Sequence, residues 1–204
     1  MTEVRLKPCR RCGGLPVVLV GDPAGETGMP TVDVDNMNGT MAEINALIRK
    51  GHRRIAYLEG PENMPAAASR RRGYLHALEN AGIEPDPALI VRVGWSVREA
   101  YAGVTELLAK EKFTALVGSN AYSTYGGLQA LLDAGLRVPE DVAVAGVDDA
   151  PICEYAKPSI TTLRQPLYQM GVLATDQVID RIQGKSGSCC ATYAMPEMII
   201  RESI

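Results

Sequence analysis

The amino-acid sequence predicts an α/β protein built on parallel sheets. Short apolar runs rich in β-branched residues alternate with longer stretches in which apolar residues recur at helical spacing, as in consecutive βαβ units. The runs lie at residues 17–20, 55–58, 115–117 and 142–147. Strands of a parallel sheet are covered by helices on both faces, so continuous apolar runs of this kind are expected for them.

The composition is that of an ordinary globular protein. Of the 204 residues 46% are hydrophobic, and 21 Lys and Arg stand against 24 Asp and Glu, for a net charge of −3. Such a chain has no positive field for DNA, because phosphate binding needs clustered cations. No apolar run approaches the roughly 18 residues that cross a bilayer, and the basic N-terminus lacks the apolar segment of a secretory signal. We therefore predict a cytoplasmic protein that does not enter a membrane.

Five cysteines, an odd number, fit a reducing compartment better than a disulfide framework. Cys9 and Cys12 form a C-x-x-C motif that resembles half of a zinc knuckle and would also suit a redox pair. A structural zinc site usually takes its second pair about two to four residues apart, whereas Cys189 and Cys190 are adjacent. We predict no metal and no cofactor.

Capping signals place helices between the strands. Asp35 and Asn36 can cap a helix that Gly51 ends, and Ser96 with Glu99 has the spacing of a capping box. Further helices are expected at residues 70–81, 121–134 and 166–183.

Polar and aromatic side chains stand where the predicted strands end. In open parallel sheets ligands bind at the carboxyl ends of the strands, so these positions form a candidate site. The residues are Arg70, which is expected to open a helix, Trp95, Asn120 and the carboxylate pair Asp148–Asp149. A bidentate donor, a flat apolar face, an amide and a carboxylate acceptor together suit a polyhydroxyl or heterocyclic ligand.

Each of these residues also has a purely structural interpretation. Trp95 can pack on Ala100, Arg70 can be solvated with its neighbours, and Asn120 or Asp148 can cap the segment that follows. Their convergence at strand ends favours a binding site. An enzyme with Mg²⁺ on the two aspartates is a further alternative, but the sequence has no phosphate loop, nucleophile elbow or H-E-x-x-H motif, so we expect no enzyme.

Five motifs occur in order along the chain: GHRRIA at 51–56, R-x-x-G-Y-x-x-A-L-x-x-A-G-I at 70–83, AGLRVPEDV at 134–142, GVDD at 146–149 and TTLRQP at 161–166. Together they closely resemble the effector-binding core of LacI/GalR-type transcriptional regulators, from about Leu15 to the C-terminus. The resemblance implies a periplasmic-binding-protein-like type I fold with two parallel-sheet lobes, of which the N-terminal lobe is incomplete here.

The resemblance also implies roles for five residues. Arg70 matches the arginine that binds ligand hydroxyls or carboxylates, Asp148 the acidic acceptor, and Asn120 the amide after the preceding strand. Trp95 matches the aromatic residue against which the ligand packs. Gln165 lies in a crossing between the lobes where some relatives contact the ligand. The implied effector is a sugar or a small purine-like heterocycle.

The function that the resemblance implies is transcription regulation. Closure of the lobes over the effector would change a homodimer that holds operator DNA through helix-turn-helix heads. Such a head is missing from the sequence, which points to a fragment, a misassigned start or a truncated product, and we expect no sequence-specific operator binding by these residues alone. The alternative is a periplasmic-type sugar-binding protein of a transport system, which would need a signal peptide.

The expected organisation has five parts. They are an unassigned segment at 1–14, a partial N-terminal lobe at 15–53, a C-terminal lobe at 54–161, a helix returning to the N-terminal lobe at 162–188, and the terminal strand of the C-terminal lobe at 189–204. Because the partial lobe cannot cover both faces of its sheet, apolar surface should be exposed there.

Some positions depart from the family pattern. Glu43 stands where a small residue is usual, Ala66 where a serine or threonine is usual, and Ala121 where an aspartate is usual. These departures indicate either an unusual effector or a decayed pocket. Within the aspartate pair, Asp148 is the expected effector acceptor and Asp149 the expected cap of the turn at Ala150.

Overall fold

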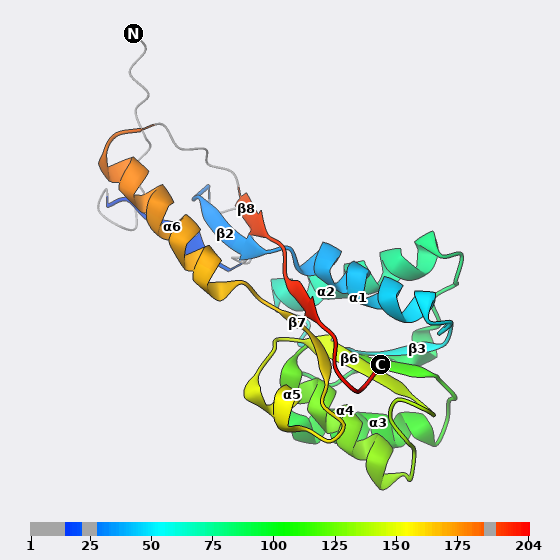
Figure 1. The fold of residues 1–204 in the computed structure, drawn as a ribbon. Helices are drawn as coiled ribbons and strands as arrows, with labels where there is room; N and C mark the ends of the chain where they lie inside the picture. The colour runs from blue at the N-terminus through cyan, green and yellow to red at the C-terminus, as the bar shows by residue number, and fades with distance from the viewer. Residues whose placement is uncertain (1–14, 22–27, 186–190) are drawn as a thin grey trace. The chain divides into compact units, whose positions relative to one another are not determined.

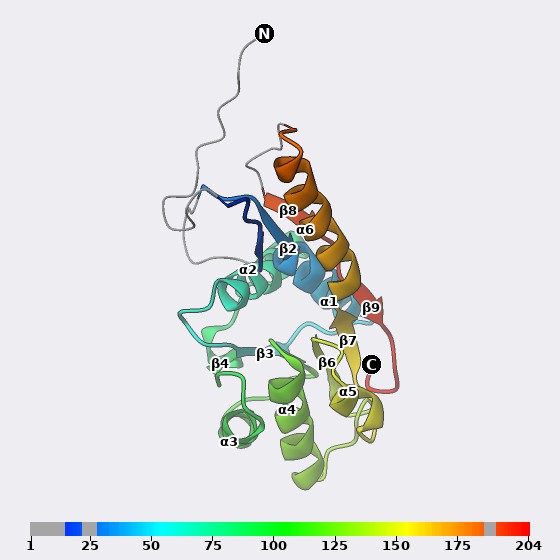
Figure 2. The same ribbon diagram turned by 90° about the vertical axis from the view of Figure 1, so that its left-hand side faces the viewer.

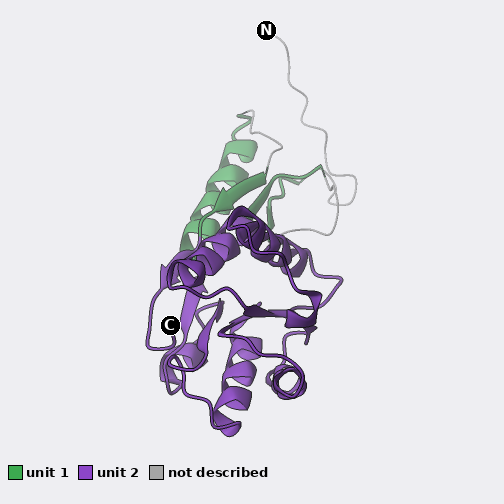
Figure 3. Cartoon of the chain, turned by 90° about the vertical axis from the view of Figure 1, so that its right-hand side faces the viewer, with its two compact units in different colours: residues 1–35, 166–195 green, residues 36–165, 196–204 purple. Residues whose placement is uncertain are grey.

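The computed structural model describes residues 15–21, 28–185 and 191–204. The chain, drawn in Figure 1, divides into two compact units that Figure 3 colours separately: residues 1–35 with 166–195, and residues 36–165 with 196–204. Cys9, Cys12, Cys189 and Cys190 lie outside the described residues, so the proposals about the C-x-x-C motif stay predictions.

The second unit is built on a six-stranded sheet with the order β4-β3-β5-β6-β7-β9. Its strands are β3 (Ile55–Glu59), β4 (Ile90–Arg92), β5 (Ala115–Gly118), β6 (Ala143–Val147), β7 (Thr161–Arg164) and β9 (Glu197–Ile199). Neighbouring strands run parallel except β7 and β9, which are antiparallel. The predicted fold class, α/β with a parallel sheet, is confirmed.

Helices cover both faces of this sheet. They are α1 (Asn36–Arg49), α2 (Pro65–Asn80), the 3-10 helix η1 (Pro87–Leu89), α3 (Val97–Leu108), α4 (Ala121–Asp133) and α5 (Pro151–Tyr155). Figure 1 and Figure 2 show α1 and α2 on one face and α3, α4 and α5 on the other. Successive residues of β3 alternate between the two cores: Ile55 and Tyr57 pack with α1 and α2, whereas Ala56 and Leu58 pack with α3 and α4. Burial on both faces explains the continuous apolar runs.

The first unit has a three-stranded parallel sheet of order β1-β2-β8. The strands are β1 (Leu19–Val20), β2 (Thr31–Val34) and β8 (Ala191–Ala194), and α6 (Leu167–Ile182) packs Met170 and Ala174 against β2. The opposite side of α6 carries apolar side chains in solvent, including Tyr168 at 88% exposure. Apolar surface is therefore exposed in this unit, as expected. No helix among the described residues is long and apolar enough to cross a membrane.

The boundary between the units differs from the expected one. It falls after residue 35, not after residue 53, because α1 packs Ile44 and Leu47 into the core shared with α2. Gly73 allows this close approach, since a Cβ at that position would overlap the carbonyl oxygen of Met37. The C-terminal segment also differs: β8 pairs with β2 in the first unit before β9 joins the second.

Most helix ends follow their local signals. Gly51, with a φ of 99°, ends α1, and the Ser96 hydroxyl oxygen accepts a hydrogen bond from the Glu99 amide at the start of α3. The full reciprocal capping box lies elsewhere, between Asn120 and Ser123. Helix α2 begins at Pro65, five residues before the expected start, because proline suits the first helical turn.

Two glycines let α4 approach the sheet. Gly118 of β5 and Gly146 of β6 are partners in register, and a Cβ at either position would overlap the side chain of Thr124 in the first turn of α4. Because Asn120 is the N-cap of α4, the close approach of this helix also positions Asn120 at the edge of the sheet.

We predict that Gly146→Ala lowers the free energy of unfolding by about 1–3 kcal/mol, because the added methyl group overpacks against Thr124. Gly171→Ala is the matched control. Gly171 lies in open space within α6, so its replacement is expected to raise stability by up to about 1 kcal/mol through better helix propensity. Chemical denaturation measures both changes, and equal effects of the two substitutions would contradict the packing explanation.

Candidate functional site

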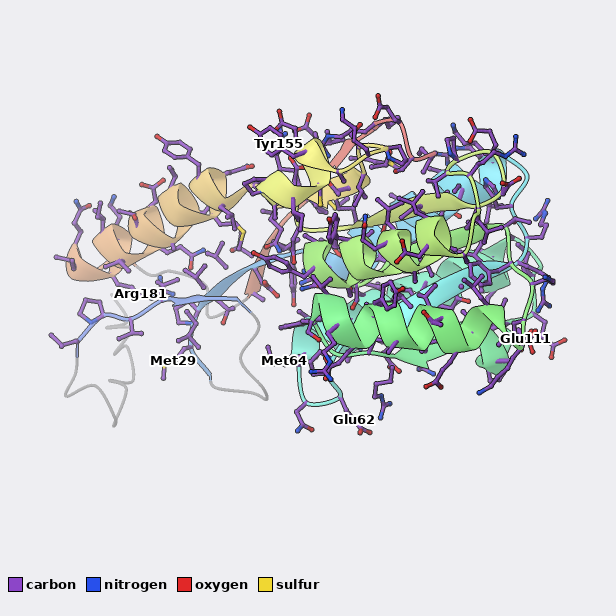
Figure 4. All side chains as sticks on the ribbon, turned by 90° about the horizontal axis from the view of Figure 1, so that it is seen from below. Met29, Glu62, Met64, Glu111, Tyr155 and Arg181 are labelled. Carbon is purple, nitrogen blue, oxygen red and sulfur yellow. The ribbon has the colours of Figure 1, made fainter. Side chains whose placement is uncertain are left out.

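The candidate residues all belong to the second unit and follow its five parallel strands in turn. Arg70 comes after β3, Trp95 after β4, Asn120 after β5, Asp148 after β6 and Gln165 after β7. Figure 4 shows Met64, just before α2, at the opposite end of the unit from Glu111, which precedes β5. The candidate residues therefore follow the carboxyl edge of the sheet, where open α/β folds bind ligands.

Arg70 is a buried cation held by three elements. It lies within α2, not at its start, and is only 4% exposed, so the alternative of a solvated arginine is wrong. Its Nε donates to Asn36 Oδ1 of α1 at 2.8 Å, and Nη1 donates to the carbonyl oxygen of Ser119 at 2.5 Å. Nη2 pairs with Asp148 Oδ1 at 3.4 Å. These bonds aim the guanidinium at the carboxyl ends of β5 and β6.

Asp148 has an unusual backbone conformation. Its φ of 70° is the only positive value of a non-glycine residue in the described part of the chain. Such a conformation costs free energy and concentrates at functional sites. Oδ1 accepts hydrogen bonds from both Arg70 and Gln165 Nε2, yet the side chain stays 34% exposed. Asp148 thus presents a fixed carboxylate to solvent beside a buried cation.

Asn120 and Trp95 are placed by local packing. Asn120 Oδ1 accepts from the Ser123 amide at 2.8 Å, so the capping interpretation is confirmed, and only its Nδ2 remains to donate to a ligand. The Trp95 indole lies on Gly60, where a Cβ would overlap its Nε1. This Nε1 is buried and has no hydrogen-bond partner among the described residues. Hydrogen bonds thus join Arg70, Asp148 and Gln165, while the role of Trp95 as an aromatic face stays a prediction.

Asp149 does not cap the following turn, contrary to expectation. Ala150 occupies the cap of α5 without a side-chain hydrogen bond. The Asp149 carboxylate instead binds Arg164 and Arg201, each at 2.7 Å, and accepts from the Thr162 hydroxyl at 2.9 Å. Burial opposes ionisation, but the hydrogen bonds from Arg201, Arg164 and Thr162 hold the pKa of Asp149 below its usual value. Asp149 therefore ties β7 and the C-terminal segment to the turn that carries Asp148.

Three contributors escaped sequence reasoning. Asn36 was expected only as a helix cap, and Ser119 and Arg201 carried no expectation at all. Ser119 contributes a backbone carbonyl, which any residue type supplies, so its identity holds no signal. Arg201 reaches Asp149 from the far end of the chain, and nothing in the local pattern indicates that pairing.

We predict that Asp149→Ala lowers the free energy of unfolding at neutral pH by about 3 kcal/mol, because it leaves the largely buried Arg201 without its carboxylate. The stabilisation by Asp149 is complete above the pKa of an unfolded aspartate, about 3.9. It is lost as the pH falls through the lower pKa of folded Asp149. The free energy of unfolding, measured by chemical denaturation at a series of acidic pH values, should therefore fall less steeply with decreasing pH in the variant than in the wild type.

Glu62→Ala provides a control for this prediction. Glu62 also pairs with an arginine, Arg92, at 2.9 Å, but both side chains are exposed, so a much smaller loss of stability is expected. Equal losses for the two variants would show that the Asp149 network does not stabilise the turn.

Comparisons with known proteins agree on one family. A family profile described as a periplasmic binding protein-like domain matches residues 44–204. The HTH-type transcriptional regulator CelR of Thermobifida fusca is 35% identical over 193 residues, which cover 93% of this chain and 57% of that protein. The HTH-type transcriptional repressor CytR of Escherichia coli strain K12 is 32% identical over 189 residues, with coverages of 92% and 55%.

A solved structure points the same way. A complex of the transcriptional regulator CelR with cellobiose has a TM-score of 0.86 and 35% identity, and the match covers 93% of this chain and 59% of that one. The chain thus spans little more than half the length of the relatives that it matches.

Proposed function

The chain belongs to the periplasmic binding protein-like family, in the branch of LacI-type transcriptional regulators, and we propose that it is the effector-binding and dimerisation core of such a regulator. The relatives named above are transcriptional regulators, which favours this function over a binding protein of a transport system and over an enzyme. The proposed place of action is the cytoplasm, where regulators meet DNA.

The proposed ligand is an uncharged sugar-like molecule or a small purine-like heterocycle. Arg70 and Asp148 neutralise one another, so the site offers no net charge to attract an ion. The remaining carboxylate oxygen of Asp148 can accept from a hydroxyl, and the Asn120 and Gln165 amides can bind hydroxyls or ring nitrogens. The Trp95 face suits a sugar ring or a heterocycle. Cellobiose bound to the relative CelR is a ligand of this chemistry.

One observation carries this proposal above the others. Asp148, in a strained backbone conformation, is fixed by Arg70 and Gln165 and still exposes a third of its side chain. A carboxylate needed only for packing would gain nothing from the strain or from the exposure. A carboxylate that binds ligand hydroxyls needs both a fixed direction and access.

In the parent regulator we propose that effector binding changes the affinity for operator DNA. The DNA would be bound through a helix-turn-helix head outside these 204 residues, and the regulator would act as a homodimer. The similarity to CelR and CytR, both HTH-type regulators, supports the DNA-binding part, and the homodimer is what the resemblance to LacI-type regulators implies.

We predict that calorimetric titration of the chain with a panel of cellobiose, other neutral sugars, nucleosides and purines finds at least one binder. Arg70→Lys and Asp148→Asn should each weaken that binder by about 10- to 100-fold, because each removes charge-assisted hydrogen bonds. The matched substitutions Arg92→Lys and Asp176→Asn, at exposed positions, should leave the affinity unchanged. Circular dichroism checks that each variant is folded, and full affinity in Asp148→Asn would place the ligand elsewhere.

We also predict that the chain is a dimer in sedimentation equilibrium at micromolar concentration. Specific homodimers bury on the order of 1,600 Å² or more, an area that keeps the subunits together at such concentrations. A monomer at micromolar concentrations would contradict the dimerisation part of the proposal. The effector-binding part would still be tested by the calorimetric titration.

A further inference from the structure

A stripe of polar side chains runs along the buried face of α1. Asn36, Thr40 and Glu43 are spaced four and three residues apart, so they share one side of the helix, and all three are buried. Ile44 and Leu47 of the same helix enter the apolar core. Polar groups at such positions are costly unless they are bonded or serve another purpose.

Glu43 is the most unusual member of the stripe. It is 0% exposed, and neither of its carboxylate oxygens has a hydrogen-bond partner among the described residues. The same holds in the described structure for the Thr40 hydroxyl and for the hydroxyl of Tyr57, a fully buried residue of β3. Burial raises the pKa of Glu43 well above its usual value, and the nearby Arg70 charge offsets this only in part. Glu43 therefore keeps its proton at a pH where exposed glutamates have lost theirs.

Arg70 thus lies under the influence of two acids. Asp148 pairs with its guanidinium on the exposed side, while Glu43 acts on it from within the core. Asn36, from the same stripe as Glu43, holds the Arg70 Nε. A charged Glu43 would add a second carboxylate attraction on this guanidinium, in competition with that of Asp148.

We propose that Glu43 is a positioning residue for Arg70: as a neutral acid it leaves the guanidinium directed at Asp148 and the effector, and on losing its proton it draws the guanidinium inward and weakens effector binding. This inference rests on the proposed function of the site.

The neighbours of Glu43 leave few competing charges. Helix α1 packs against α2, β6 and β7. From α2 the charge that acts on Glu43 is that of Arg70, and Tyr57 of β3 adds a neutral phenol whose own pKa burial raises. Within their bounds β6 has no titratable side chain and β7 has only Arg164, which is bound to Asp149. Glu59 and Arg71 also act on Tyr57, and they pair with each other at 3.2 Å.

The test compares effector affinity in the wild type and in Glu43→Gln between about pH 6 and pH 9, a range above the pKa of ordinary carboxyl groups. The probe is the tightest neutral ligand found in the titration panel. Wild-type affinity should fall with rising pH, by up to about tenfold per pH unit once Glu43 titrates. Glu43→Gln copies the neutral acid, so its affinity should not fall. Glu106→Gln, an exposed acid of α3, should keep the wild-type profile.

A second variant separates charge from hydrogen bonding. Glu43→Met conserves volume without polarity and should also remove the pH dependence. Parallel profiles for the wild type and Glu43→Gln would overturn the proposal.

If no ligand in the panel binds the wild type, the proposed function fails and the role of Glu43 is decided by a measurement without ligand. The Nε–H signal of Arg70 in NMR spectra, identified by its loss in Arg70→Lys, should move with pH in the wild type and stay constant in Glu43→Gln. A signal that moves equally in both would reject the positioning role.

Discussion

The buried guanidinium of Arg70 is the constraint on which the site depends. A cation that is almost completely removed from water must find acceptors, and it finds them in Asn36 of α1, the Ser119 carbonyl after β5 and Asp148 after β6. These three groups come from segments far apart in the chain. Satisfying one side chain therefore fixes the relative position of a helix and two strand ends, which are the parts from which the site is made.

The packing of α4 on the sheet and the ion pairs of Asp149 position the groups that surround Arg70. Gly118 and Gly146 let the first turn of α4 settle on the sheet, which brings Asn120 and Ser119 to their places. On the other side, Asp149 binds two arginines and secures the turn in which Asp148 adopts its strained conformation. Strain of this kind persists only where neighbouring interactions outweigh it. The Asp149 network supplies such interactions next to Asp148.

The family scaffold and the ligand chemistry come from different residues. The parallel sheet with helices on both faces is common to the relatives, and such scaffolds accept many ligands through changes at the strand ends. Glu43 is buried on α1, where the charge of Arg70 acts on it. In the proposed role a substitution there would change the charge balance of the site without replacing Arg70 or Asp148.

The sequence by itself determined the fold class, most helix ends and the position of the candidate residues after predicted strands. Those features follow from local periodicity and capping, which depend on residues that are neighbours in the chain. The order of the strands within the sheet is a property of the tertiary structure. Only the tertiary structure decided that α1 packs with α2, that Asp149 binds Arg164 and Arg201, and that Glu43 is buried beside Arg70. Helical spacing shows which residues share a face but not which element covers that face. Partners of buried charges, such as those of Asp149 and Arg70, come from distant parts of the chain that only folding brings together.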